Sequence, residues 1–210
     1  MDKRIVASLD ITDRRVLLDL ASRLSDEIFA IKINWPTILT CGVDIIRELS
    51  DFGNVICDLK IADIPNTNRM IMEIIRERNP FAVIAHAFPG LDSIQALLDA
   101  SEGVKVIGVV SMSNEGAERY LNPLHLKILN DLKNTSAYGI IAPGNDYRIL
   151  QEIAKKKGNL KIFSPGIGAQ GGSPSLAIMN GADYIIIGRN IYNAQNPEAY
   201  VRSVNQQIEK

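Results

Sequence analysis

The chain has 210 residues, of which 46% are hydrophobic and 22% charged, and its 23 basic and 24 acidic residues give a net charge of −1. This composition is ordinary for a globular protein, and it excludes an overall field that would attract nucleic acid or a membrane surface. No apolar run approaches the ~20 residues of a membrane span, and Met1-Asp-Lys-Arg4 leads into an apolar run rather than a signal peptide. Cys41 and Cys57 form no C-x-x-C pair, so we expect two buried, reduced thiols. A cytoplasmic protein with no nucleic-acid or membrane partner is expected, with a local positive site if its ligand is an anion.

Short apolar runs rich in β-branched residues recur eight times along the chain. They cover residues 4–10, 28–33, 54–60, 81–87, 104–111, 137–143, 160–166 and 182–189. Amphipathic stretches with helical spacing lie between them, and the first and third have as apolar faces Val16, Leu17, Leu20, Ala21, Leu24 and Ile71, Ile74, Ile75, respectively. Helix start signals stand before the first and seventh helices, at Thr12-Asp13 and Ser173-Pro174.

Apolar strands that alternate with helices indicate a parallel sheet covered on both faces. Eight such units indicate a closed (β/α)8 TIM barrel rather than an open doubly wound sheet. We find no linker or shift in composition, so residues 1–210 are expected to form a single domain. The longest connection, 113–136, leaves room for an extra turn of helix rather than a second domain.

Chemically capable residues gather at the carboxyl ends of the predicted strands, where barrel active sites lie. These strand-end residues are Asp10, Lys32, Asp58, Lys60, His86, Ser111, Ser113, Pro143, Pro165, Gly166, Gly188 and Arg189. The strand starts carry ordinary residues such as Arg4, Asn54 and Lys161. Packing alone does not explain this asymmetry, so the sequence predicts an active site at the carboxyl-terminal mouth.

The most informative segment is Asp58-Leu-Lys-Ile-Ala-Asp-Ile-Pro-Asn-Thr67, which puts three charges in six residues after a buried strand. Alternate side chains of a strand share a face, so Asp58 and Lys60 should project the same way, with Asp63 beyond them on a loop. Burying two acids and a lysine is costly unless they pair, and such clusters often shift proton affinities for chemistry. The alternative is a structural salt bridge at a strand end.

A second segment, Gly166-Ile-Gly-Ala-Gln-Gly171, matches the dinucleotide pattern G-x-G-x-x-G. A dinucleotide site also needs an acid at the end of the next strand, whereas Asp183 begins that strand and Gly188-Arg189 ends it. The position favours instead the phosphate site that barrels form from the loops after strands seven and eight. There, glycine backbone N–H groups, a helix N-terminus and Arg189 can hold phosphate oxygens. Turn glycines beside a surface arginine are the alternative.

Together with Ser164-Pro-Gly-Ile-Gly-Ala-Gln-Gly-Gly172 and the Ile-Ile-Gly-Arg that ends at Arg189, the Asp58–Thr67 segment resembles the orotidine 5′-phosphate decarboxylase family of the short archaeal type. The resemblance covers essentially the whole chain. Sister enzymes share the Asp-x-Lys-x-x-Asp core, and the Ile-Pro-x-Thr extension is the specific part. The resemblance implies conversion of orotidine 5′-phosphate to uridine 5′-phosphate and CO2 in de novo pyrimidine biosynthesis, without metal or organic cofactor.

The resemblance also implies roles for individual residues. Lys60 would stabilise the carbanion at pyrimidine C6 and then protonate it, Asp58 would lie beside the leaving carboxylate, and Lys32 would contact the ribose and the neighbouring acids. Asp63 and Thr67 would reach into the partner's site of a homodimer. The remaining contacts would be Asp10 to a ribose hydroxyl, Ser113 to the pyrimidine edge, Pro165 to the ring, and Gln170, Gly188 and Arg189 to the phosphate.

Two other readings compete. A sister enzyme acting on a sugar phosphate would use a magnesium ion and an acid at the end of strand two, where this chain has Lys32. A non-catalytic phosphate-ligand sensor would be expected to lose a member of the charged cluster, and all are present. His86 is expected to be a hydrogen-bonded wall residue, His125 a surface residue, and Trp35 a packing or dimer contact. Asp10 and Ser113 could instead start helices.

Overall fold

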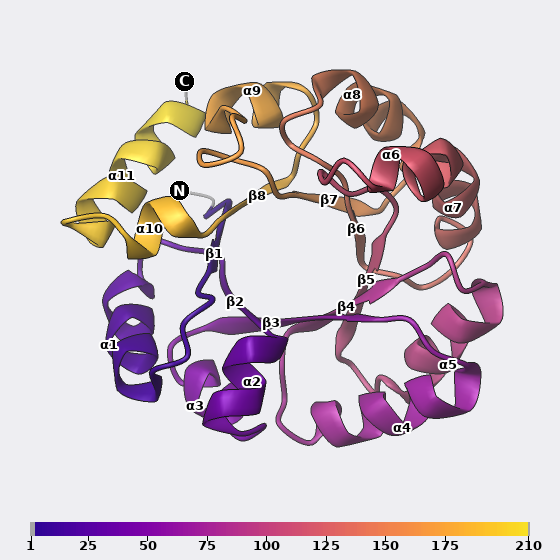
Figure 1. The fold of residues 1–210 in the computed structure, drawn as a ribbon, viewed down its shortest axis with the longest axis horizontal. Coiled ribbons are helices and arrows are strands. Elements are labelled where there is room, and N and C mark those ends of the chain that lie inside the picture. Colours follow the sequence, from indigo (N-terminus) through magenta and orange to yellow (C-terminus); the bar gives the residue numbers. More distant parts are fainter. Residues whose placement is uncertain (1–2, 210) are drawn as a thin grey trace.

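Eight parallel strands form a closed barrel in a computed structural model that describes residues 3–209 (Figure 1). Each strand pairs with the next along the chain, and the eighth pairs with the first. The strands are β1 (Ile5–Ser8), β2 (Ala30–Asn34), β3 (Asn54–Ile61), β4 (Ala82–His86), β5 (Lys105–Val109), β6 (Gly139–Ile141), β7 (Lys161–Ser164) and β8 (Tyr184–Ile187). The predicted (β/α)8 barrel is therefore confirmed.

Helices surround the barrel and connect its strands (Figure 1). They are α1 (Arg14–Leu24), α2 (Trp35–Cys41), α3 (Ile45–Ser50), α4 (Pro65–Arg76), α5 (Leu91–Ala100), α6 (Ala117–Tyr120), the 3-10 helix η1 (Asn122–Leu124), α7 (His125–Leu132), α8 (Tyr147–Lys156), α9 (Pro174–Met179), α10 (Arg189–Tyr192) and α11 (Pro197–Ile208). The long connection after β5 holds α6, η1 and α7, as its length predicted. Among residues 3–209, no helix has the length and apolar character needed to cross a membrane.

The helix start signals act as predicted. Asp13 caps α1, its side chain accepting a hydrogen bond from the N–H of Val16 at 3.0 Å, and Ser173 caps α9 in front of Pro174.

The apolar faces of the helices are only partly as predicted. Val16 and Ile74 are 52% and 53% exposed, because each lies at the outer edge of its helix stripe rather than over the barrel.

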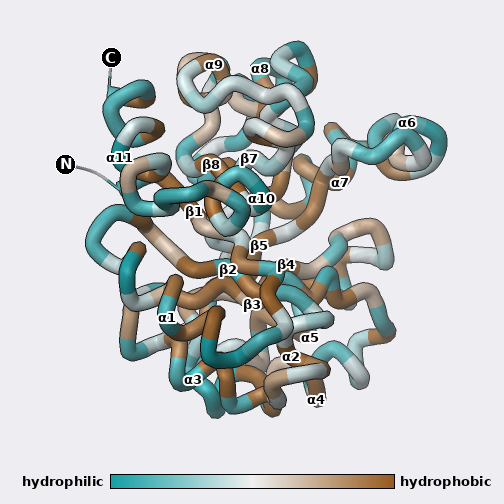
Figure 2. The backbone as a smooth tube through the Cα atoms, turned by 60° about the vertical axis from the view of Figure 1, so that its left-hand side comes forward, coloured by the Kyte–Doolittle hydropathy of each residue, from teal (hydrophilic) through white to brown (hydrophobic). Residues whose placement is uncertain are grey.

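The hydrophobic residues concentrate in the strands and in the helix faces that cover them (Figure 2). An aromatic layer closes the amino-terminal end of the barrel. Its ring centroids lie 4.1–6.5 Å apart, and its members at the starts of the even-numbered strands are Phe29, Phe81, Tyr138 and Tyr184, packed with Phe163 of β7. Alternate strands supplying one layer of side chains is the usual filling of such a barrel. This end is therefore packed, and the opposite end is left for a site.

Most strands are shorter than predicted. The pairings of β5 and β6 end at Val109 and Ile141, although the apolar runs continue to 111 and 143, and β8 ends at Ile187 before α10 begins at Arg189. An apolar run continues as far as side chains are buried, whereas a strand ends where its hydrogen-bonded neighbour ends. The predicted strand-end residues Ser111, Pro143 and Arg189 thus stand in the loops and the helix above the barrel.

Candidate active site

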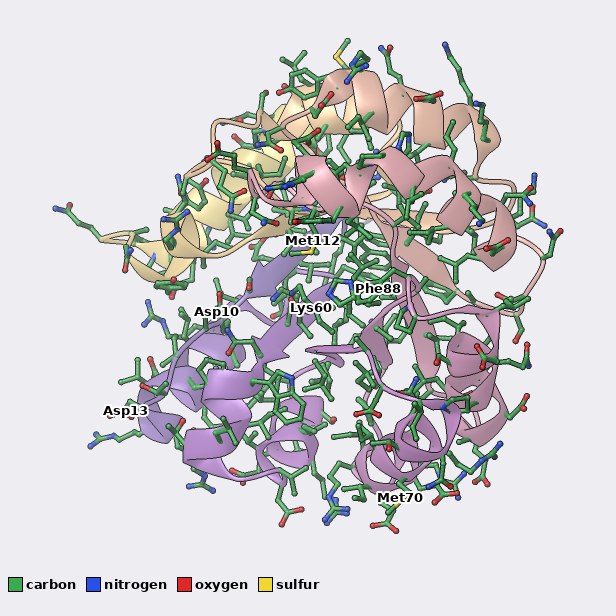
Figure 3. All side chains as sticks on the ribbon, turned by 45° about the vertical axis from the view of Figure 1, so that its right-hand side comes forward. Asp10, Asp13, Lys60, Met70, Phe88 and Met112 are labelled. Carbon is green, nitrogen blue, oxygen red and sulfur yellow. The ribbon has the colours of Figure 1, made fainter. Side chains whose placement is uncertain are left out.

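A pocket of about 440 Å³ opens at the carboxyl ends of the strands. Among the residues that line it are nine of the eleven predicted site residues: Asp10, Lys32, Asp58, Lys60, Ser113, Pro165, Gln170, Gly188 and Arg189. In Figure 3, Asp10 and Lys60 face the centre of the barrel, whereas Asp13 and Met70 lie at the periphery. The barrel thus brings together residues from the carboxyl ends of six strands that are far apart in the sequence.

An alternating chain of charges crosses the floor of this pocket. The Nζ of Lys32 lies 2.9 Å from Asp58 Oδ2 and 3.9 Å from Asp10 Oδ1, and the Nζ of Lys60 lies 2.7 Å from Asp58 Oδ1. Ser8, which sequence reasoning did not identify, donates from Oγ to Asp10 Oδ1 at 3.1 Å. Asp58 is therefore held by one lysine on each oxygen. We call Asp10, Lys32, Asp58 and Lys60 the charge array.

Burial and charge act in opposite directions on Asp58, whose side chain is 10% exposed. Burial alone would raise its pKa, but the charges of Lys32 and Lys60 and their hydrogen bonds outweigh it and lower the pKa below the ordinary value for an aspartate. Asp58 is therefore ionised at neutral pH. The Lys32 side chain is only 8% exposed, whereas that of Lys60 is 41% exposed and extends into the pocket.

Lys60 occupies a strained position in the backbone. The pairing of β3 with β4 passes from Asp58 opposite Ile84 directly to Ile61 opposite Ala85, so Leu59 and Lys60 form a bulge. Lys60 has φ +44°, in the left-handed region that a side chain disfavours. Lys60 contacts Asp58 as predicted. The alternation of side chains along a regular strand does not by itself explain this contact, because the bulge sets the direction of the Lys60 side chain.

Trp35 supports this bulge from outside the pocket. Its indole Nε1 donates to the carbonyl oxygen of Leu59 at 2.7 Å, and Trp35 is not among the residues that line the cavity. The bulge displaces this carbonyl from regular strand pairing, so a donor from α2 satisfies it. This placement agrees with the prediction that Trp35 makes a packing contact rather than stacking on the substrate.

The loops after β7 and β8 form the opposite wall. The loop after β7 closes on itself, since the N–H of Gly168 donates to the Gly172 carbonyl at 2.8 Å, with Gly168 at φ +73°. After β8, Gly188 passes so close to β1 that a Cβ there would lie 3.2 Å from the carbonyl oxygen of Ser8. Arg189 is exposed beside it, and no ion pair involving Arg189 occurs within residues 3–209. This wall thus presents a free cation to the pocket.

One hydrogen bond joins two loops at the rim. Ser113, after β5, donates from Oγ to Oε1 of Gln170, in the loop after β7, at 2.8 Å. Both residues are exposed and line the pocket. The contact links the predicted pyrimidine side of the pocket to its predicted phosphate side.

Asp63 and Thr67 are the two predicted site residues outside the pocket. Asp63 is exposed, and its Oδ1 accepts from the N–H of Ile64 at 2.7 Å, while its carbonyl oxygen accepts from Ser93 Oγ at 2.8 Å. Thr67 lies in the first turn of α4. Neither residue therefore contributes to the pocket of its own chain.

Exposed apolar side chains lie on and around α2, α4 and α5, and one of them, Ile64, follows Asp63 directly. They are Trp35, Leu39, Ile64, Met70, Ile74, Phe88 and Leu91, which are between 42% and 76% exposed. A surface with this many large apolar residues is typical of an interaction site. We call this group the α2–α4–α5 surface.

The two histidines differ in how well sequence placed them. The prediction of a hydrogen-bonded wall residue at His86 is not met: the ring packs against Phe88 at 5.1 Å between ring centroids, it does not line the substrate pocket, and within residues 3–209 its buried Nδ1 has no hydrogen-bond partner. Burial, and secondarily the nearby Lys60, lowers the pKa of His86. The prediction of a surface position for His125 is wrong. Its side chain is only 14% exposed, because its ring nitrogens contact the Asn122 carbonyl and Glu152.

The cysteine prediction also needs one correction. Cys57 is fully buried in β3, and burial, with a smaller contribution from Asp58, raises its pKa to about 12. Cys41 is only half-buried, because it lies at the end of α2, where its Sγ contacts the carbonyl oxygen of Thr12. Both cysteines are free thiols in the structure.

These features define a (β/α)8 barrel with a charged pocket at the carboxyl ends of its strands, where enzymes of this fold have their active sites. Residues 3–204 match the model of the Orotidine 5′-phosphate decarboxylase / HUMPS family, and the chain belongs to this family. It is 40% identical over 210 residues to the orotidine 5′-phosphate decarboxylase of Thermoplasma volcanium, covering 100% of this chain and 95% of that protein. It is 42% identical over 207 residues to the Pyrococcus abyssi enzyme, covering 97% and 98%.

Solved structures agree with the sequence relatives. Orotidine 5′-phosphate decarboxylase from Pyrococcus horikoshii OT3 has a TM-score of 0.92 and 41% identity, with coverage of 98% of this chain and 99% of that one. The Methanocaldococcus jannaschii enzyme, solved in complex with the inhibitor BMP, has a TM-score of 0.94 and 33% identity, with complete coverage of both chains. The family and the activity predicted from the sequence are therefore confirmed. The roles of the individual residues remain predictions.

Proposed function

We propose that the charge array carries out the reaction of this orotidine 5′-phosphate decarboxylase (EC 4.1.1.23) of pyrimidine biosynthesis. The carboxylate at C6 leaves as CO2, its bonding electron pair stays on C6, and Lys60 donates the proton that completes uridine 5′-phosphate. The observation that carries this proposal is the position of Asp58, ionised and fixed between two lysines, one of which projects into the pocket.

The physical difficulty of the reaction is the carbanion at C6, which has no adjacent electron sink. A fixed ammonium in a pocket with little water stabilises such a charge without reorganising. Asp58 fixes Lys60 through the 2.7 Å contact, and it would stand beside the leaving carboxylate, where like charges repel until CO2 departs. Lys32 contacts both Asp58 and Asp10, so its positive charge offsets the acids near the substrate. No metal or organic cofactor enters this scheme.

The rest of the pocket would bind the parts of the substrate that do not react. Asp10 is proposed to bind a ribose hydroxyl and Ser113 the pyrimidine edge, with Pro165 against the ring. Gln170, Gly188 and Arg189 are proposed to hold the phosphate, for which the free cation of Arg189 is the main support. Binding energy from this remote group can drive closure of the loops over the reacting ring.

We further propose a homodimer in which Asp63 and Thr67 complete the partner's site. Both residues lie outside their own pocket, and the α2–α4–α5 surface beside them is apolar and exposed. In this arrangement Asp63 would be a second acid next to Lys60, beside the Asp58 that its own chain supplies.

One assay tests the proposed reaction. Purified protein should remove the absorbance of orotidine 5′-phosphate at a rate that EDTA does not change. If activity disappeared with EDTA and returned with Mg²⁺, the cofactor-free scheme would fail, and metal-assisted chemistry of the sugar-phosphate type would replace it.

Mixing two inactive variants tests the shared site. Dimers that combine one Asp63→Asn chain with one Lys60→Ala chain should contain one wild-type site and one doubly defective site. With random re-pairing, half of the dimers are mixed, so activity should return to about a quarter of the wild-type value. If Asp63 served its own chain, every site would keep one defect and the mixture would stay inactive.

A further inference from the structure

We propose that Asn122 is a positioning residue for this reaction: its side-chain amide fixes the backbone of Met112 and thereby holds Ser113 where it meets Gln170. The inference rests on the proposed role of Ser113 in binding the pyrimidine edge. It assigns a function to a residue on η1 that does not line the substrate pocket.

We call the two hydrogen bonds between the Asn122 amide and the Met112 backbone the clamp, and they lie where the sheet ends. The pairing of β5 with β6 stops at Val109 and Ile141, so Met112 has no strand neighbour in that ladder. Asn122 takes this place: its Oδ1 accepts from the N–H of Met112 at 3.0 Å, and its Nδ2 donates to the carbonyl oxygen of Met112 at 3.0 Å. A side-chain amide thus satisfies both backbone groups of one residue, as a paired strand would.

The amide of Asn122 is also fully used. Asn122 is 4% exposed, its Oδ1 accepts a second hydrogen bond from Ser111 Oγ at 2.8 Å, and its Nδ2 donates a second one to Glu118 Oε1 at 2.5 Å. An Asn amide offers two donors and two acceptor positions, and all four are occupied here. A buried polar group whose partners are all in place favours a single arrangement of the segment around it.

The segment that is held in this way needs such a restraint. The α6 region stands out from the barrel (Figure 2), and the residues from Ser113 to Gly116 at its base are exposed. Met112 and Lys60, both labelled in Figure 3, line the same pocket. Because Ser113 follows Met112 directly, a fixed Met112 peptide determines where the Ser113 hydroxyl can reach. Loss of the clamp should therefore weaken the hydrogen bond between Ser113 and Gln170.

A double-mutant cycle separates positioning from general stabilisation. We expect Asn122→Ala to lower kcat/KM by about tenfold at a temperature where circular dichroism shows the variant folded. In the Ser113→Ala background, the same Asn122→Ala change should cost about twofold or less, because the hydroxyl that it positions is gone. Asn205→Ala is the matched control: it removes an amide bond to a backbone carbonyl, that of Glu27 at 2.9 Å, far from the pocket, and should leave kcat/KM unchanged.

The outcomes are distinguishable. If Ser113→Ala alone has wild-type kinetics, the proposed binding role of Ser113 fails. If Ser113→Ala is impaired but Asn122→Ala costs the same tenfold in both backgrounds, or nothing in either, then Asn122 does not act through Ser113 and the inference is wrong. If Asn122→Ala does not fold, Ser111→Ala takes its place, since it removes only one contact to Oδ1. Ser111→Ala should then lower kcat/KM by about threefold with Ser113 present and not when Ser113 is alanine.

Discussion

The two walls of the pocket are built in different ways. On the β1–β3 side, the charge array is set on or directly after strands, and Asp58 and Lys32 are almost fully buried with every charge paired. On the β5, β7 and β8 side, Ser113, Gln170 and Arg189 stand on exposed loops or at a helix start, and one side-chain hydrogen bond joins Ser113 to Gln170. This difference suits two different tasks, stabilising a charge and binding a phosphate. Groups that stabilise a charge must be fixed before substrate arrives, whereas groups that grip a phosphate can move to close over it.

The largest effect is expected at Lys60. Lys60→Ala removes both the fixed ammonium and the proton donor, so we expect kcat/KM to fall by at least about 10⁴-fold while the protein still folds and binds uridine 5′-phosphate. Stopped assays and nucleotide titration measure the two properties separately. Lys105→Ala, which changes an exposed lysine at the opposite end of the barrel, is the control and should be near wild type. Substantial turnover by Lys60→Ala would remove this side chain from the mechanism.

Asp58→Asn tests how much the anion between Lys32 and Lys60 contributes to the stability of the folded protein. Two lysines would lose their shared anion, and we expect a loss of about 3 kcal/mol of unfolding free energy, the low end for a broken buried pair because Lys60 is partly in water. Activity should fall as well, because Lys60 loses its orienting partner.

The same substitution has a defined pH dependence. The folded-state pKa of Asp58 is lowered, so its ionised form stabilises the protein above the ordinary value of about 3.9, and that stabilisation is lost as the pH falls through the lowered folded-state pKa. The difference in unfolding free energy between wild type and Asp58→Asn should be constant from about pH 8 to 5 and shrink in acid. Urea titrations across this range measure it, and a difference that grew in acid would contradict the assigned direction.

The loop wall should respond more mildly. Arg189→Ala removes a charge-assisted phosphate contact worth roughly 1.5–3 kcal/mol, so kcat/KM should fall by at least about tenfold, and Gln170→Ala should also weaken substrate and product binding. A nucleoside without phosphate should be a poor substrate for the same reason. Arg148→Ala on the exposed face of α8 is the control. If both pocket variants kept wild-type kinetics, the phosphate would bind elsewhere.

Trp35→Phe should give the smallest effect, because it keeps a ring on α2 but removes the donor to the Leu59 carbonyl. We expect about 1 kcal/mol less stability and a decrease of a few-fold in kcat, since the bulge carries Lys60. Thermal unfolding and steady-state kinetics would show both. An unchanged kcat would mean that the bulge keeps its shape without this hydrogen bond.

Sequence reasoning identified the barrel and most of the pocket because both depend on regular patterns. Eight apolar runs specify the strands, and the carboxyl-end rule then places Asp10, Lys32 and Arg189 together. It could not find Asn122, whose partners at Met112 are ten residues away in the chain and are backbone atoms that leave no mark on the sequence. It also missed the bulge at Lys60, because the register against β4 depends on the neighbouring strand rather than on β3 alone.

The left-handed backbone at Lys60 has a consequence for any attempt to improve this protein by selection or design. A side chain in that conformation costs about 1–2 kcal/mol, which glycine would not incur. Lys60→Gly should therefore be more stable than Lys60→Ala, and a search for thermostable variants without an activity screen would favour glycine at this position. Resistance to heat and catalytic rate thus compete for a single residue, and a more robust protein obtained in this way would be an inactive one.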